Sequence, residues 1–174
     1  MNDSALIALQ VAGAISQDLR EKLKPPSETQ SFPEHPVVLI ALVKNTRGYI
    51  EKVAHQANGA YANGWYDASA VMLRRLLETL IIECYEKFQI SSKIQDKDGN
   101  FLFLRDLVAA VSTEASWNLG RNARAALHKL KDLGDKSAHN RRFNAHREDI
   151  ERLVPSIRDV VQELVALADL KRSP

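Results

Sequence analysis

The sequence predicts an all-α protein, an antiparallel helical bundle, and three observations lead to this fold class. Apolar residues recur at helical intervals in almost every segment, which is typical of amphipathic helices. No segment shows the sustained alternation of apolar and polar residues that indicates a strand. The chain has 174 residues, of which 45% are hydrophobic. One domain with a substantial core is therefore expected.

Residues 4–24 are predicted to form a helix that precedes the bundle. Its apolar residues follow one another at a spacing of four: Ile7, Val11 and Ile15. Residues 25–36 contain four of the six prolines and predict an extended linker. We therefore expect an N-terminal helix within residues 1–24, a proline-rich linker at 25–36 and the bundle domain at 37–174.

Five helical segments are expected in the bundle. They span residues 37 to about 58, roughly 66–88, 101–114, 119–133 and 148–170. The second segment is the most hydrophobic of the five. Residues 91–101 predict a loop or a short hairpin, because Asp98 and Gly99 form a turn pair. Pro155 either kinks the last helix or starts a second helical segment.

Composition and charge restrict the partners and the compartment. The formal net charge is only +2, so a nucleic-acid partner requires a local basic patch. The single cysteine, Cys84, lies among apolar residues and excludes a disulfide framework, which favours a reducing compartment. Asp3 stands where a signal peptide carries a basic residue, and no run approaches the ~20 apolar residues of a transmembrane helix. A cytoplasmic protein without a membrane partner is expected.

Metal ions and cofactors are not expected. The stretch DKDGN, residues 96–100, resembles the start of a calcium-binding EF-hand loop. Phe101 and Leu107, however, occupy the positions of the required glycine and glutamate. The five histidines form no HExxH motif and have no cysteine partners, so a zinc site is not indicated. None of the seven glycines belongs to a phosphate-binding loop.

The candidate site is the stretch GDKSAHNRRFNAH, residues 134–146. It holds two histidines, two adjacent arginines and a lysine between two helical segments. Two interpretations remain open. The stretch is either a phosphate-handling site or a solvated connection, in which Arg141, Arg142 and Arg147 pair with nearby carboxylates for less than ~1 kcal/mol each.

Two stretches of the chain resemble a widespread prokaryotic helical family of unknown function. In residues 62–88, a small-aromatic turn precedes an alanine-rich helix with an Arg-x-x-Leu-Glu pattern. The residues that fit this pattern are Arg74 or Arg75 with Leu77 and Glu78. In residues 129–140, KLKDLGDKSAHN resembles the family's signature of Arg-x-x-Gly-Asn followed by Ala-His. The matching residues are Gly134, Ala138 and His139, and the departures are Lys131 and Asp135.

That family is grouped with the HEPN-like superfamily, whose four- or five-helix members include metal-independent ribonucleases, toxins and defence components. The resemblance covers roughly residues 45–170 and implies a HEPN-like bundle, here with an extra N-terminal helix. It also implies a homodimer, and the apolar content of the last helix points the same way. We expect an RNA or nucleotide ligand or a protein partner.

By resemblance, an active HEPN ribonuclease pairs an arginine with a histidine four to six residues later. Arg141 and His146 fit that spacing, whereas Lys131 and His139 occupy the family's own signature, so two registers compete. A histidine supplies a base near neutral pH, and a cation stabilises charge on the phosphorane. The other candidates, for binding RNA or ligand or for orienting these groups, are Lys136, Arg142, Arg74 and Glu78.

Two functions follow from these alternatives. The first is a non-catalytic module that dimerises and binds a partner protein or nucleotide-bearing ligand in a defence or regulatory system. The second is a metal-independent endoribonuclease, acting as a toxin or defence effector. We favour the first, because Lys131 replaces an arginine that would hold phosphate through two hydrogen bonds, and because the near-neutral chain attracts RNA weakly. Neutralisation of the cleft by Asp132 and Asp135 would favour it further.

Overall fold

The computed structural model describes residues 11–14 and 35–171. Its contacts divide the chain into two units, residues 1–31 and 32–174, and each is described by itself. In the first unit, residues 11–14 are helical. The rest of the predicted helix over 4–24, and all but the last two residues of the predicted linker over 25–36, lie outside the described residues.

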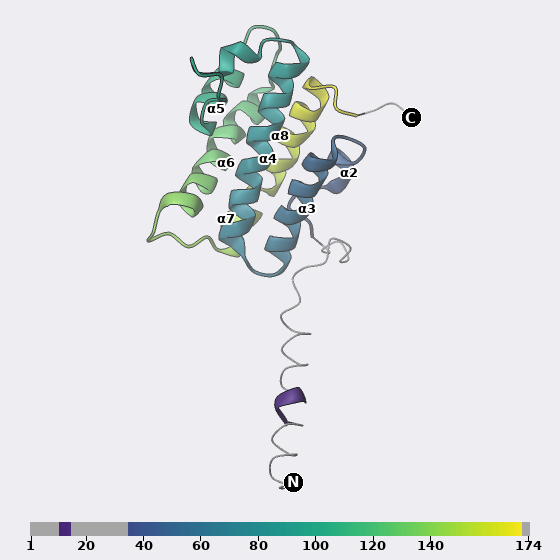
Figure 1. Cartoon of the computed structure of the whole chain (residues 1–174), viewed down its shortest axis with the longest axis vertical. Helices are drawn as coiled ribbons and strands as arrows, with labels where there is room; N and C mark the ends of the chain where they lie inside the picture. Colours follow the sequence, from purple (N-terminus) through teal and green to yellow (C-terminus); the bar gives the residue numbers. More distant parts are fainter. Residues whose placement is uncertain (1–10, 15–34, 172–174) are drawn as a thin grey trace. The chain divides into compact units, whose positions relative to one another are not determined.

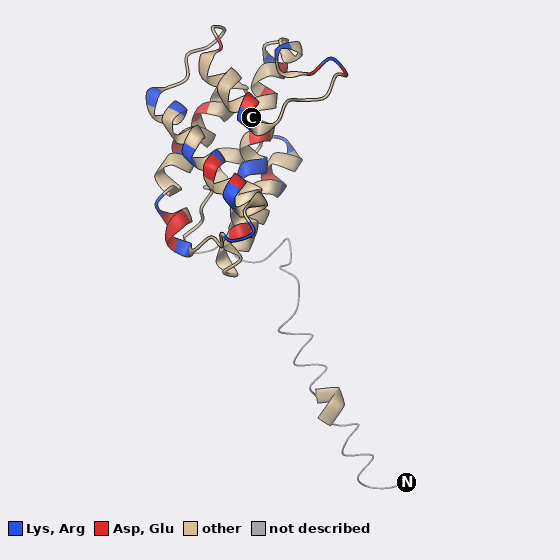
Figure 2. Cartoon of the chain, turned by 90° about the vertical axis from the view of Figure 1, so that its left-hand side faces the viewer, with Lys and Arg blue, Asp and Glu red and all other residues tan. Residues whose placement is uncertain are grey.

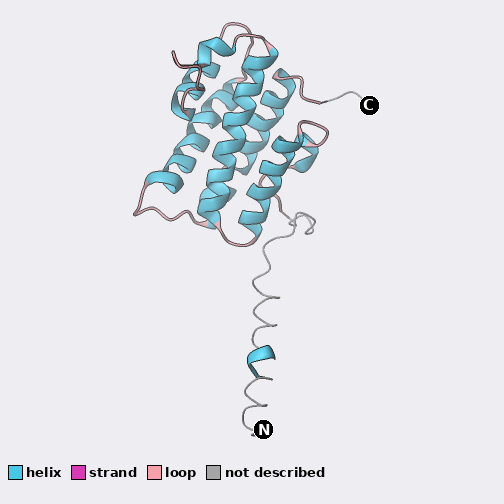
Figure 3. Ribbon diagram, viewed as in Figure 1, coloured by secondary structure: helices cyan, strands magenta, loops and turns pink. Residues whose placement is uncertain are grey.

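The second unit is all-helical over its described residues, which confirms the predicted fold class at that level (Figure 3). Its α-helices are α2 (Ile40–Val43), α3 (Gly48–Ala62), α4 (Tyr66–Lys87), α5 (Leu104–Thr113), α6 (Arg121–His139), α7 (Arg147–Glu151) and α8 (Val154–Leu167). A 3₁₀ turn at Ser91–Ile94 follows α4. Residues 35–171 contain no strand, only an isolated bridge between Gln95 and Phe101. Among the described helices, none combines the length and apolar character of a membrane span.

Helix α4 is the central element of this unit. It contacts α3, α5, α6, α7 and α8 (Figure 1). A helix surrounded in this way needs apolar residues on several faces rather than on one stripe. The fully or almost fully buried apolar residues of α4 are Ala70, Leu73, Leu76, Leu77, Leu80, Ile81, Cys84 and Tyr85. The predicted bounds of α4 are correct to within a residue, but the prediction that it is the most hydrophobic helix is wrong, because its charged residues make it less apolar on average than α3, α5 and α8.

The predicted helix from residue 37 to about 58 is wrong in two respects. The chain leaves α2 after Val43, and Asn45 takes a φ of 65°, in the left-handed region where asparagine is tolerated. The backbone N–H of Asn45 donates to Glu51 Oε1 at 2.9 Å, which fixes the turn into α3. Helix α3 then continues to Ala62 instead of ending near Asn58.

The end of α6 and the start of α8 also differ from the sequence pattern. Helix α6 continues past Leu133 to His139, so the first six residues of GDKSAHNRRFNAH are helical and only residues 140–146 form the connection. The last predicted helix is divided into α7 and α8, and Pro155 lies in the first turn of α8. A proline fits there because the first backbone N–H groups of a helix have no intrahelical partner. The second of the two alternatives for Pro155 is therefore correct.

The apolar residues of α8 are buried within the chain itself. They are Ile157, Val160, Val161, Leu164 and Val165. Cys84 of α4 is 0% exposed, and its Sγ lies 3.5 Å from the carbonyl oxygen of Leu164. Burial raises the pKa of this thiol to about 12. The apolar content of the last helix is thus explained by the core of one chain, and it no longer supports a dimer.

Candidate functional site

The two sequence stretches that carry the family resemblance meet where α6 crosses α4. Gly134 of α6 faces Arg74 of α4, and a Cβ added at Gly134 would lie 2.7 Å from the Arg74 Cβ. Real Cβ atoms do not approach one another so closely. The glycine of the predicted signature is therefore required by helix packing: it lets the two backbones approach.

Asp135 joins the charged residues of this crossing. Its Oδ1 accepts a hydrogen bond from Arg74 Nε at 2.9 Å, and its Oδ2 pairs with Lys131 Nζ at 2.9 Å. Lys131 Nζ also bonds to Asp132 Oδ1 at 3.0 Å. Two carboxylates therefore neutralise two of the five cations that the sequence offered for the site, Arg74 and Lys131. The crossing is an electrically balanced cluster rather than an electropositive cleft.

The pKa values of this cluster follow from its contacts. Burial alone would raise the pKa of Asp135, but the hydrogen bond and charge of Lys131, together with Arg74, lower it on balance. The hydrogen bonds to Asp135 and then Asp132 raise the pKa of Lys131. Both members of the central pair therefore keep their charges over the whole neutral range, and neither is suited to proton transfer there.

Glu78 is separate from this cluster. It is half-buried on α4, one helical turn after Arg74. Its carboxylate makes no hydrogen bond or ion pair with any residue of the described 35–171 segment, and Arg75 is exposed. Arg74, by contrast, forms an ion pair with Asp135 of α6 rather than with a residue of its own helix.

The end of α6 and the following connection carry exposed cations. The side chains of Lys136, His139, Arg141 and Arg142 are exposed, and none makes an ion pair within the described part of the chain. His139 is the last residue of α6. Lys131 lies eight residues earlier, so the two are separated by roughly 12 Å along the helix axis. On the face seen in Figure 2, basic and acidic residues are otherwise interspersed.

The connection over residues 140–146 is held in place near its C-terminal end, at Ala145 and His146. The backbone N–H of Ala145 donates to Asp67 Oδ1 of α4 at 3.0 Å, and Phe143 packs partly buried against the core. The backbone N–H of His146 donates to Asp149 Oδ2 at 2.9 Å, which caps the start of α7. His146 therefore has a structural position at a helix end, and no hydrogen bond joins its side chain to Arg141.

One of the proposed surface pairs is present. Arg147 Nε bonds to Glu151 Oε1 at 2.8 Å, one turn along α7. Glu151 also accepts a hydrogen bond from the hydroxyl of Tyr61 on α3 at 2.7 Å. This pair lies in α7, directly after residues 134–146, and it ties α7 to α3.

A second polar cluster lies at the opposite end of α4, and sequence reasoning missed it. Glu83 is 3% exposed, and its carboxylate accepts hydrogen bonds from Arg47 Nε at 2.8 Å and from the hydroxyl of Tyr49. Burial and then the hydrogen bond to Glu83 raise the pKa of Tyr49 to about 12. The charge of Glu83 raises the pKa of Arg47. The signal in the sequence was a glutamate that directly follows the apolar residues LII at positions 80–82.

Comparison with known proteins identifies a family of unknown function. No curated protein and no solved structure matches the chain significantly. A family model described as a domain of unknown function, DUF4145, matches residues 55–173. This range includes α4, the α6 crossing and the connection to α8, and it is more than half of the chain. The chain therefore belongs to the DUF4145 family, a helical family of unknown function.

Proposed function

We propose that this protein is a HEPN-like antiparallel bundle that acts as a non-catalytic, dimerising interaction module. It binds an acidic or phosphate-bearing partner, and it serves a prokaryotic defence or regulatory system. The observation that carries the proposal is the double pairing of Asp135 with Arg74 and Lys131. Metal-free RNA cleavage needs a cation that is free to stabilise the developing charge on phosphate. At this crossing, both cations are already bound to carboxylates.

The histidines also lack the support that a catalytic base requires. A general base is held in position by a neighbouring group, so that its orientation and protonation suit the reaction. His139 is exposed at the end of α6, and no described residue donates to or accepts from its ring. His146 lies at the cap of α7, where its backbone is tied to Asp149. Neither arrangement positions an imidazole against a substrate.

The exposed cations support binding in place of cleavage. Lys136, Arg141 and Arg142 project from the end of α6 and from a connection that is anchored to α4 through Ala145. An anchored surface of like charge attracts an anionic partner without an internal counterion to displace. The ion pairs of Arg74 and Lys131 with Asp132 and Asp135 stay intact during this binding.

A metal-independent ribonuclease remains the second candidate. The observation that favours it is that Arg141 and both histidines of the stretch lie within one exposed region, residues 139–146. By the resemblance, a dimer would bring two such regions to a shared cleft. In that case the partner chain would supply the groups that orient each histidine.

The test separates binding from cleavage on the same substrate. Wild type, His139→Ala and His146→Ala are incubated with a labelled mixed RNA pool in EDTA, and dimerisation is followed by light scattering during size-exclusion chromatography. We expect a dimer and no cleavage. Cleavage that is lost in one histidine variant, with folding preserved, would contradict the proposal and identify the catalytic register.

Binding is measured by fluorescence anisotropy with a labelled oligonucleotide. The double variant Arg141→Gln with Arg142→Gln is expected to bind more weakly by about tenfold, and the slope of affinity against salt is expected to fall by about two charges. Arg158→Gln is the matched control, because Arg158 is an exposed arginine on α8. Equal loss in both variants would mean that binding is spread over the whole surface.

A further inference from the structure

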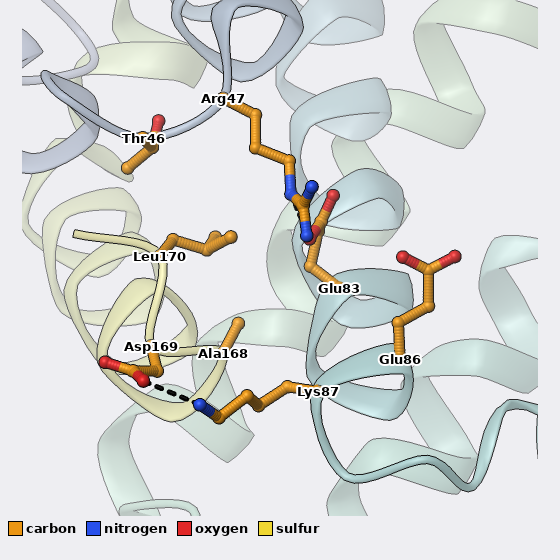
Figure 4. Close-up of a pocket in the computed structure, with 8 residues that line it drawn as sticks. All are labelled: Thr46, Arg47, Glu83, Glu86, Lys87, Ala168, Asp169 and Leu170. Atoms are coloured by element: carbon orange, nitrogen blue, oxygen red, sulfur yellow. Dashed lines mark hydrogen bonds and ion pairs between the residues drawn. The ribbon is translucent and has the colours of Figure 1, made fainter. Parts of the chain in front are cut away.

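A cavity of about 340 Å³ lies at the opposite end of α4 from the connection over 140–146. It is bounded by the turn between α2 and α3, by the last turns of α4 and by the segment that follows α8 (Figure 4). The lining residues on which its chemistry depends are Arg47, Glu83, Glu86, Lys87, Asp169 and Leu170. A volume of this size is at the lower end of the range for small-molecule sites.

Two ion pairs form opposite walls of the cavity. Arg47 Nε bonds to Glu83 Oε2 at 2.8 Å, and Lys87 Nζ bonds to Asp169 Oδ2 at 2.6 Å. Figure 4 shows these pairs together with Glu86, which projects from α4 on the side of the view away from Asp169. The carboxylate of Glu86 makes no hydrogen bond or ion pair with a residue of the described range. Two cations face three carboxylates, so the lining carries a net charge of −1.

The helix ends add to this negative potential. Helix α4 ends at Lys87 and α8 ends at Leu167, so the carboxyl ends of both helices border the cavity. The last carbonyl groups of a helix carry a partial negative charge that favours cations. Lining charge and helix ends therefore both favour a positively charged ligand.

The remaining walls and the donor set define the kind of cation. Leu170 is 7% exposed and Ala168 is 4% exposed, and together they give the cavity an apolar side. Within the described residues, no three histidine, cysteine, aspartate or glutamate side chains are grouped closely enough to hold a metal ion. A ligand with one charged end and an aliphatic body fits these walls.

We propose that this cavity binds a small aliphatic amine. Its ammonium group donates hydrogen bonds to the carboxylate of Glu86, and its carbon chain extends towards Leu170. The Arg47–Glu83 pair closes the inner wall, and the hydroxyl of Tyr49 donates to the other carboxylate oxygen of Glu83. Both oxygens of Glu83 are therefore engaged by residues of the chain itself. Glu86 is the carboxylate that can accept hydrogen bonds from a ligand.

The test is a titration of the full chain, labelled with ¹⁵N, with 1,4-diaminobutane as the probe. We expect saturable shifts of the amide signals of Thr46, Glu86 and Asp169. Glu86→Gln is expected to weaken binding by about tenfold, the loss associated with one charge-assisted hydrogen bond. Glutarate, a dianion of similar length, is expected to give no saturable shift at these residues.

Glu148→Gln is the matched control, because Glu148 is an exposed glutamate on α7 outside the cavity. It is expected to bind the diamine as wild type does. Circular dichroism confirms that both variants are folded. The proposal is overturned if the diamine gives no saturable shift, if Glu86→Gln binds it as tightly as wild type, or if glutarate saturates the same residues.

Discussion

Replacement of Gly134 by alanine tests the close contact between α4 and α6. The added Cβ would lie 2.7 Å from the Cβ of Arg74 and 3.2 Å from its Cγ and Cδ. The Cβ of Arg74 is attached directly to the α4 backbone, so no rotation of the side chain removes it. The two helices must move apart, and the Arg74–Asp135 hydrogen bond lies next to the point of contact.

Three contributions decide the free energy of unfolding of this variant. Alanine in place of glycine within a helix stabilises it by about 1 kcal/mol. Overpacking a close contact destabilises by about 1–3 kcal/mol. Weakening the Arg74–Asp135 pair, whose side chains are 23% and 32% exposed, removes about 0.2–1 kcal/mol more. We therefore expect a net destabilisation of about 0.2–3 kcal/mol.

The assay is urea unfolding of Gly134→Ala beside Gly59→Ala. Gly59 lies within α3, and nothing is within 4 Å of a Cβ placed there. Because the added methyl group meets no neighbouring atom, replacement of Gly59 by alanine is expected to stabilise the protein by about 0.5–1 kcal/mol. The two substitutions are thus expected to have opposite signs. Equal stabilisation in both would refute the argument that the helix crossing requires glycine.

Three further outcomes are expected. Glu83→Gln removes the buried carboxylate that accepts hydrogen bonds from Arg47 and Tyr49, while the exposed Arg47 stays hydrated, and should lower the free energy of unfolding by about 0.5–1.5 kcal/mol, measured in urea; unchanged stability would contradict the account of that cluster. The pKa of Glu114 is lowered to about 2, first by the hydrogen bond from Lys93, so its contribution is present above its unfolded pKa and is lost as pH falls from about 4.5 towards 2. Glu114→Gln should therefore be less stable than wild type near neutral pH and approach it in acid, and a gap that does not change with pH would exclude this linkage. Asp67→Ala removes the acceptor of the Ala145 amide and should accelerate hydrogen exchange at that amide, by a factor that corresponds to about 0.5–1.5 kcal/mol; unchanged exchange would show that other contacts hold the connection.

The fold class could be predicted because helical periodicity depends on local sequence. The bounds of α4 were predicted well, since apolar residues recur along its whole length and the turn at Gly64 and Trp65 marks its start. The break at Asn45 could not be predicted, because apolar residues keep helical spacing on both sides of it and an asparagine, not a glycine, takes the left-handed backbone conformation. The end of α6 was placed too early, because its last turns are largely exposed and have no apolar pattern.

The candidate site was only partly accessible to sequence reasoning. The two signature stretches were found, but the pairing of Arg74 with Asp135 joins residues 61 positions apart. That pairing depends on how α4 and α6 are rotated against each other, which periodicity does not determine. The second cluster required a different observation, that a glutamate in an apolar helix needs a partner from elsewhere in the chain. Glu83 finds it in Arg47, 36 positions away.

The burial of Cys84 provides a kinetic reporter that needs no mutagenesis. The chain has one cysteine, and its thiol is enclosed between α4 and α8, with its pKa raised to about 12 by burial. A thiol reagent reacts with it only when the two helices separate, so the rate of labelling measures how often this part of the core opens. A compound or partner that binds the folded chain should slow the labelling. The same reaction therefore becomes a screen for ligands whose identity is not known in advance.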